Sequence, residues 1–299
     1  MTRRGWVLFA AMGVIWGIPY LFIKIAVSEL SPASLVFLRT AIGAGLLLPI
    51  AFARKDLGPL LAHWKWIVAY TFVEVAAPWF FLSDAERRIS SSLSGLLIAL
   101  VPSIGAILAW ATGADDRVDL RRVAGLGLGF LGVAALVGLD VGAGDLGAVG
   151  EVALVALGYA LGALIIGRKL SGLPLFGVVA SSLALTMIVY APLGFAQLPR
   201  ALPSPQVVVA VTVLGVICTA LAFLVFFPLV AEVGAARATV ITYVNPAVAL
   251  ALGVAFLGEP LTIGIVLGFV LIVLGSVLAT RRTAPSKSSV ALTRSPDLL

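Results

Sequence analysis

Ten apolar stretches of about 20 residues, separated by short polar breaks, run through the sequence from residue 6 to residue 280. A bilayer has a hydrocarbon core about 30 Å thick, which a helix crosses in about 20 residues because it satisfies its own backbone hydrogen bonds. The predicted helices cover 6–28, 33–53, 65–84, 89–111, 122–140, 146–167, 174–196, 207–229, 235–257 and 262–280. Only 11% of the residues are charged, too few to cover a soluble surface of this size. The sequence predicts an all-α integral membrane protein with ten transmembrane helices.

The positive residues predict the orientation of these helices. With the N-terminus in the cytoplasm, 15 of the 20 Lys and Arg residues face the cytoplasm, 3 face outward, and Lys24 and Arg39 lie within helices. Because positive residues favour the cytoplasmic side, we expect both termini to be cytoplasmic in a multi-pass protein of the cell inner (plasma) membrane. The net charge of +6 is then explained by topology and by anionic lipid headgroups. Membrane lipids are expected partners, and nucleic acid is not.

The second half of the sequence repeats the first. The stretch Leu-Val-Pro-Ser-Ile around Pro102 matches Val-Asn-Pro-Ala-Val around Pro246, about 144 residues later, and Gly125 matches Gly268. Because each repeat holds five spans, an odd number, the second copy enters the membrane from the opposite side. Inverted repeats of this kind are typical of transporters with a site at mid-membrane depth. The predicted divisions are a first five-helix repeat over 1–140, an inverted second repeat over 141–280, and a disordered cytoplasmic tail over 281–299.

Several short motifs, in this order, resemble the EamA-type branch of the drug/metabolite transporter superfamily over about residues 5–280. They are Trp16-Gly17, Pro19-Tyr20, Lys24, Phe37-Leu38-Arg39, the Pro102 and Pro246 motifs, and Leu257-Gly258-Glu259-Pro260-Leu261. The resemblance implies secondary transport of small metabolites, commonly the export of amino acids. The repeats differ in detail, since Tyr159 stands near the position that matches Trp16, and no arginine matches Arg39.

Glu74 lies near the middle of the third predicted span. A charged group at the bilayer centre costs about 2.5–3.5 kcal/mol on insertion scales, so it should face a cavity or a partner. It could hold a substrate ammonium group or a coupled proton. The alternative is a protonated or paired carboxyl group that only supports the packing.

Arg39 lies deep in the second predicted span, where its planar guanidinium group could bind a substrate carboxylate. It could equally pair with Glu151 or bind backbone carbonyl groups as a structural tie. Lys24 and Arg168 lie nearer the ends of their spans, and we expect them to reach the lipid headgroups.

Aromatic residues within the spans form a second candidate site, since rings and a few polar groups suit a hydrophobic amino acid or an amphipathic metabolite. Ordinary packing between helices is the alternative for each ring. The predicted substrate-binding or coupling residues are Glu74, Trp16, Tyr20, Trp79, Tyr159, Tyr243, Asn245 and Arg39. The predicted hinges are Pro19, Pro78, Pro102 and Pro246, because proline removes a helix hydrogen bond. The motif Gly125-xxx-Gly129 is predicted to let two helices approach closely.

Other functions find no support in the motifs. The sequence Gly127-x-Gly129-x-x-Gly132 resembles a dinucleotide fingerprint but follows no strand, and no phosphate-binding loop for ATP occurs. His63 is the one histidine, so it cannot build a metal site or a catalytic triad alone. We expect no cofactor, no metal, no ATP and no enzymatic activity.

The sequence therefore predicts a secondary active transporter that acts as a monomer. Its expected substrates are small amphipathic metabolites, above all amino acids with aromatic or other hydrophobic side chains, exported by alternating access to a central cavity. Alternatives are an importer or exchanger of another solute, such as a nucleotide sugar or a drug, and a passive channel. A membrane-embedded enzyme is a further alternative, but the cluster of catalytic side chains that it needs is not visible.

Overall fold

A computed structural model describes residues 2–113, 120–140, 145–233 and 239–280. The predicted tail at 281–299 lies outside this part of the chain. All regular elements in the described ranges are helical. The first half contains α1 (Arg3–Ile15), α2 (Pro19–Ala26), α3 (Pro32–Ala53), η1 (Gly58–His63), α4 (Trp64–Tyr70), η2 (Thr71–Ala76), α5 (Ala77–Ala85), α6 (Ser91–Ile98), α7 (Val101–Ala111) and α8 (Leu120–Asp140). The second half contains α9 (Leu146–Lys169), α10 (Leu175–Ala196), α11 (Pro205–Thr212), η4 (Val213–Leu221), α12 (Ala222–Val233), η5 (Thr239–Tyr243), α14 (Asn245–Leu257) and α15 (Ile263–Thr280).

Eight of the resulting helical stretches are long and apolar enough to cross a membrane. Two shorter apolar stretches, Ile241–Leu257 and Ile263–Ala279, occupy the places of the ninth and tenth predicted spans. The largest difference from prediction is in the third span, which begins at Gly58 in a 3₁₀ turn rather than at residue 65. The sequence signal missed this turn because it is only six residues long and begins with Gly58-Pro59, a pair that normally indicates a loop.

Local sequence explains where several helices begin. The hydroxyl group of Ser31 accepts a hydrogen bond from the backbone N–H of Ser34 at 3.1 Å and caps α3, whose first residue is Pro32. A proline there loses no helix hydrogen bond, since that N–H has no partner within the helix. Ser90 caps α6 in the same way, with a bond from Leu93 at 3.2 Å.

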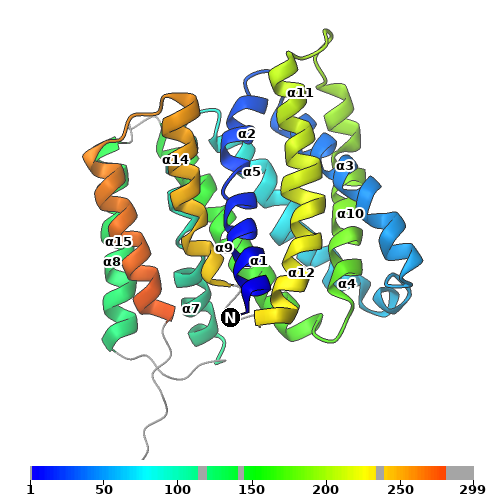
Figure 1. The fold of residues 1–299 in the computed structure, drawn as a ribbon, viewed down its shortest axis with the longest axis horizontal. Helices are drawn as coiled ribbons and strands as arrows, with labels where there is room; N and C mark the ends of the chain where they lie inside the picture. Colours follow the sequence, from blue (N-terminus) through cyan, green and yellow to red (C-terminus); the bar gives the residue numbers. More distant parts are fainter. Residues whose placement is uncertain (1, 114–119, 141–144, 234–238, 281–299) are drawn as a thin grey trace, which may run out of the picture.

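The helices pair across the two halves of the chain. α3 packs on α10, α8 on α15, α6 on α14, α5 on α9, and both α1 and α2 contact helices of the eighth span. In Figure 1 the pair α8 and α15 forms one edge of the bundle, and α3 with α10 lies toward the opposite edge. A two-fold rotation that exchanges the two halves would map this set of helix pairs onto itself.

Glycines bring α8 and α15 together. A Cβ atom added at Gly125 would lie 2.6 Å from the carbonyl oxygen of Gly275, and one added at Gly132 would lie 2.7 Å from Ile272. A Cβ atom at Gly268 would overlap the side chain of Leu136. Gly125 thus faces Gly275 across the two halves, and the predicted close approach at Gly125 is confirmed.

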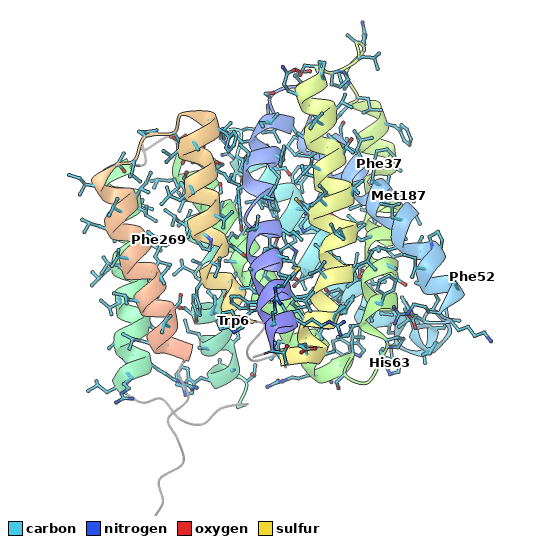
Figure 2. All side chains as sticks on the ribbon, viewed as in Figure 1. Trp6, Phe37, Phe52, His63, Met187 and Phe269 are labelled. Atoms are coloured by element: carbon cyan, nitrogen blue, oxygen red, sulfur yellow. The ribbon has the colours of Figure 1, made fainter. Side chains whose placement is uncertain are left out.

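Large apolar side chains cover the outside of the bundle. Phe52 projects from α3 and is 77% exposed (Figure 2), and Phe130 on α8 is 69% exposed. A soluble protein rarely exposes apolar groups over so much of its surface, whereas a lipid bilayer requires it.

Candidate functional site

Arg39 is the buried cation at the centre of the polar contacts inside the bundle. It lies in α3 with 7% of its surface exposed, and its guanidinium carbon sits 3.6 Å from the centre of the Trp79 ring. Its Nε donates a hydrogen bond to Thr219 Oγ1 at 3.0 Å. No acidic side chain forms a salt bridge with Arg39 in the described ranges. Glu151, the partner considered from the sequence, instead contacts Arg88 at 2.6 Å.

Two π-helical segments place the residues that hold Arg39. Trp79 follows η2 in the third span, and Thr219 lies within η4 in the eighth. The hydroxyl group of Thr219 also donates to the carbonyl oxygen of Leu214, five residues earlier, at 2.8 Å. π-helical turns are rare and occur frequently at functional sites. Sequence reasoning missed both segments and the role of Thr219.

Two tyrosines complete the surroundings of Arg39. Tyr20 on α2 is 6% exposed, and Tyr159 on α9 is half-buried and packs against both large hydrophobic clusters. Both lie within electrostatic range of Arg39, and the side chain of Trp79 interacts with the hydroxyl group of Tyr159. Four of the predicted site residues, Tyr20, Arg39, Trp79 and Tyr159, are therefore brought together from four helices of both halves.

Glu74 lies in η2, in the same span as Trp79. Its Oε2 is buried without a hydrogen-bond partner, and its side chain packs over Gly162 of α9. A Cβ atom at Gly162 would overlap the carboxylate. Tyr159 lies within electrostatic range of both Glu74 and Arg39.

Trp16 belongs to a different aromatic group. It ends α1 and contacts the rings of Phe226 at 4.8 Å and Phe223 at 6.3 Å, both on α12. These contacts are ordinary packing between the first and eighth spans, the alternative considered for each ring.

Tyr243 and Asn245 make ties to backbone groups. The hydroxyl group of Tyr243 donates to the carbonyl oxygen of Ser276 at 3.1 Å. The amide nitrogen of Asn245, in the orientation that satisfies it, donates to the carbonyl oxygens of Ile241 and Gly13, each at 3.1 Å. The two side chains connect the ninth span to the tenth and the first.

All four predicted hinge prolines lie where a helix restarts. Pro19 begins α2 after a break that follows α1, and Pro78 stands near the start of α5 directly after η2. Pro102 and Pro246 stand in the first turns of α7 and α14, each after a break in its span. The breaks before Pro102 and Pro246 thus recur at equivalent places in the two repeats, whereas α9 has no break that matches the one before Pro19.

Lys24 corrects an expectation. It does not reach toward headgroups, because its Nζ donates to the carbonyl oxygens of Glu86 at 2.5 Å and Ile89 at 2.8 Å. Arg168, in contrast, is exposed and bonds Thr112. Lys24 stays inside because the chain reverses there between α5 and α6, leaving carbonyl groups without helix partners.

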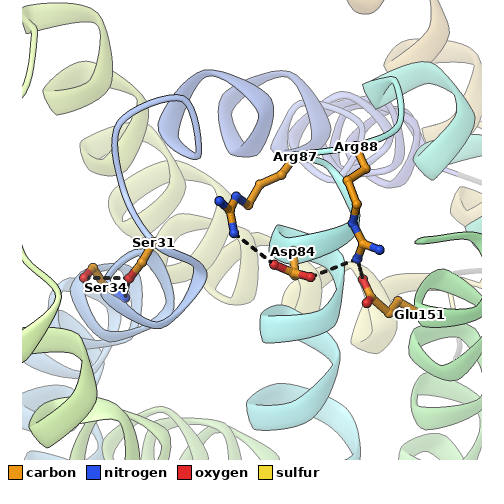
Figure 3. A network of polar contacts seen from close by, with 6 residues as sticks. All are labelled: Ser31, Ser34, Asp84, Arg87, Arg88 and Glu151. Carbon is orange, nitrogen blue, oxygen red and sulfur yellow. Dashed lines mark hydrogen bonds and ion pairs between the residues drawn. The ribbon is translucent and has the colours of Figure 1, made fainter. Parts of the chain in front are cut away.

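A second polar network lies at the same end of the bundle as Lys24. Arg88 contacts both Asp84 at 2.8 Å and Glu151 at 2.6 Å, and Arg87 contacts Asp84 at 3.3 Å (Figure 3). The Arg88–Glu151 contact joins the loop after α5 to α9 of the second half. Because these groups are partly exposed, each pair contributes about 0–1 kcal/mol.

The EamA-like transporter family model matches residues 3–138 and 147–281. The chain belongs to the EamA-like transporter family. The predicted family is thereby confirmed, and the chain is a multi-pass membrane transporter rather than an enzyme. Two matched segments, one per half, also agree with the helix pairing.

Two relatives and a solved structure are similar to this chain over most of its length. An uncharacterized transporter of Bacillus subtilis, YvbV, is 24% identical over 94% of this chain and 93% of its own length. An uncharacterized transporter of Archaeoglobus fulgidus is 26% identical over 93% of this chain and 99% of its own. A solved crystal structure is 19% identical, with a TM-score of 0.66, and covers 94% of this chain and 97% of its own. That likeness shows that the two chains share a fold.

Proposed function

We propose that this EamA transporter exports amino acids with aromatic or other hydrophobic side chains. The observation that carries the proposal is Arg39, a buried guanidinium group stacked on Trp79 that lacks an acidic partner within the described residues. A buried charge is costly unless it is paired, and a planar guanidinium group matches a carboxylate in two parallel hydrogen bonds. A substrate carboxylate would supply the missing partner.

The neighbouring groups suit the rest of such a substrate. Tyr20, Trp79 and Tyr159 offer aromatic surface for an apolar side chain. Glu74, within electrostatic range of Tyr159, offers a carboxylate for the α-ammonium group. The site would then read the two charged ends of one amino acid with groups on different helices.

Arg39 also favours an amino acid over a nucleotide sugar. A nucleotide sugar carries two phosphate charges, whereas Arg39 is the one cation among the buried residues in the described part of the chain. One guanidinium group suits one carboxylate.

Counterflow in proteoliposomes tests the proposal. Vesicles loaded with unlabelled tryptophan, phenylalanine or leucine should accumulate the same labelled amino acid, which a passive channel cannot do. The decarboxylated analogues tryptamine and phenethylamine should neither load nor compete, because they lack the group that Arg39 binds. Equal exchange of an amino acid and its decarboxylated analogue would contradict the role of Arg39.

The proposal also includes the topology. We propose that the chain spans the inner membrane ten times and that both termini lie in the cytoplasm. This topology is supported by the distribution of positive residues and by the pairing of helices across the halves. Tags with a protease cleavage site are added at residues 1 and 299. An external protease should leave both tags intact in spheroplasts and should cleave both after the spheroplasts are lysed. Cleavage of either tag in intact spheroplasts would contradict this topology.

We also propose that the halves alternate about an axis in the membrane plane and that one chain suffices for transport. In that case residues 6–140 superpose on residues 146–280 after rotation about the in-plane axis. An axis along the membrane normal would contradict the inverted repeat.

A further inference from the structure

Buried polar atoms without hydrogen-bond partners gather at one end of the bundle. In the described part of the chain there are seven such side-chain atoms, and four of them belong to Glu86, Ser91 and Ser94. All three residues are 0% exposed. Both carboxylate oxygens of Glu86 lack a donor, although a buried carboxylate normally has several. Glu86 lies between the third and fourth predicted spans, 65–84 and 89–111.

A second carboxylate lies near Glu86 and is fully satisfied. Gly258 ends α14 with a positive φ of 64°, which turns the chain toward the start of α6. There Glu259 accepts bonds from the backbone N–H groups of Ser91 at 2.7 Å and Ser92 at 2.9 Å, and from the Ser92 hydroxyl group. These donors hold the negative charge on Glu259. The negative charge of Glu259 therefore opposes a second charge on Glu86.

The cations around Glu86 are engaged elsewhere. Lys24 donates to backbone carbonyl oxygens, and Arg39 bonds Thr219. Tyr20 and Tyr159 face Glu86 within electrostatic range but carry no positive charge. Burial raises the pKa of Glu86, just beyond the third span, well above its ordinary value. Lys24 and Arg39 oppose the rise, and Glu259 adds to it.

Glu86 lies near a contact between the two halves. Glu86, Ser91 and Ser92 belong to the first half, and Glu259 belongs to the second. If the halves separate at this end during transport, water reaches Glu86 and the Glu259 contact is lost. The protonation of Glu86 is thus linked to whether this end is closed.

We propose that Glu86 is a proton-binding site, which takes a proton from water as this end of the transporter closes and returns it to water when the end opens and Glu259 leaves Ser91 and Ser92. The proton adds to one carboxylate oxygen and leaves from the same oxygen, so no other group is consumed. This binding does not require a particular substrate. The further idea that proton binding at Glu86 couples amino-acid export to pH rests on the proposed function.

Infrared spectroscopy of the full chain in lipid vesicles tests proton binding without any substrate. Exposed carboxyl groups, with pKa values of about 4, are ionised at pH 7, so a protonated carboxyl band at that pH reports a buried acid. Wild type should show this band, and Glu86→Gln should lose a clear part of its amplitude. Glu29→Gln serves as the matched control, since it removes an exposed carboxyl group whose contact with Ser204 lowers its pKa, and it should keep the full band. Absence of the band in wild type, or its full retention in Glu86→Gln, would overturn the proposal.

A second variant covers the case in which Glu86→Gln fails to fold. Glu259→Gln keeps an acceptor for the Ser91 and Ser92 amides but removes the neighbouring charge, so the band should titrate away at a lower pH than in wild type. An unchanged titration would overturn the proposal. Sodium gives a further discrimination: the band at pH 7 should be the same in sodium chloride and in choline chloride. Its loss in sodium chloride alone would mean a sodium site and would overturn proton binding.

Discussion

The third and eighth spans share a backbone distortion but carry different chemistry at it. In each span a π-helical segment, η2 or η4, ends directly before the last α-helical segment. In each a polar side chain also lies over a glycine of a neighbouring helix: Glu74 over Gly162 of α9, and Thr219 over Gly43 of α3. The polar groups differ, since the first is a carboxylate and the second a hydroxyl group that holds Arg39.

This difference shows that the repeat has kept its backbone and changed its side chains. The π-helical turns and their glycines place one polar group from each half near the middle of the bundle. A symmetric substrate would be bound best by two equal groups. An amino acid has a negative and a positive end, so it is bound best by two different groups. The divergence between Glu74 and Thr219 with Arg39 fits the second kind of substrate.

The largest expected effect comes from Arg39. Arg39→Ala should lower amino-acid counterflow about 10- to 100-fold, because a hydrogen-bonded contact to a charged group contributes about 1.5–3 kcal/mol. The counterflow rate of Arg39→Lys should lie between those of Arg39→Ala and wild type, since lysine keeps the charge but lacks the planar guanidinium group. Arg54→Ala is the matched control, because Arg54 also stacks on a ring, Phe176 at 5.0 Å, but its side chain is 59% exposed. Wild-type counterflow in Arg39→Ala would make Arg39 a packing residue.

The next effect concerns the glycine under the first π-helical segment. Gly162→Ala should destabilise the protein by about 1–3 kcal/mol, because the added methyl group overlaps the Glu74 carboxylate. Gly167→Ala, on the same helix but facing open space, should leave the thermal unfolding temperature unchanged or raise it. Tryptophan fluorescence during heating in detergent measures both. Adding Glu74→Ala to Gly162→Ala should recover part of the loss, and strict additivity of the two changes would contradict the contact.

A smaller effect is expected from the charge on Glu74. Glu74→Gln keeps the shape and hydrogen-bonding capacity of the side chain but removes its negative charge. It should lower counterflow of free amino acids about 3- to 10-fold while leaving N-acetyl amino acids, which lack the ammonium group, unaffected. Equal loss for both substrate types would place Glu74 in packing rather than in binding.

The second π-helical segment should give the smallest effect. Thr219→Val removes the acceptor of the Arg39 bond and should weaken counterflow about 2- to 5-fold, because one hydrogen bond contributes about 0.5–1.5 kcal/mol. Thr219→Ser keeps the hydroxyl group and should exchange like wild type. A larger loss in Thr219→Ser than in Thr219→Val would show that the methyl group over Gly43, not the hydroxyl group, matters.

The sequence predicts the helices and the depth of Arg39 because both follow from hydrophobic length. The glycines of α8 and α15 are also visible, since the repeat aligns Gly125 with Gly268. The π-helical segments are not visible, because an extra residue in a helical turn leaves an apolar stretch apolar.

Glu86 is missed for a different reason. It precedes Arg87 and Arg88, and a run of charged residues between two spans normally indicates a solvated loop. The adjacent arginines do lie outside, in the network with Asp84 (Figure 3), while the chain turns the Glu86 side chain inward. Only the contacts with Lys24 and the burial of the loop reveal this, and both involve segments distant in sequence.

The glycine-lined contact between α8 and α15 also sets an order on biosynthesis. α8 ends at Asp140, whereas α15 ends at Thr280, so at a synthesis rate of about 5–20 residues per second α8 waits about 7–28 s for its partner. During that interval its small-residue face meets lipid, or other unfinished helices, instead of a close neighbour. The first half is therefore incompletely packed in the membrane until the second half is made. α15, the last helix to leave the ribosome, completes the packing of α8, which was made long before it.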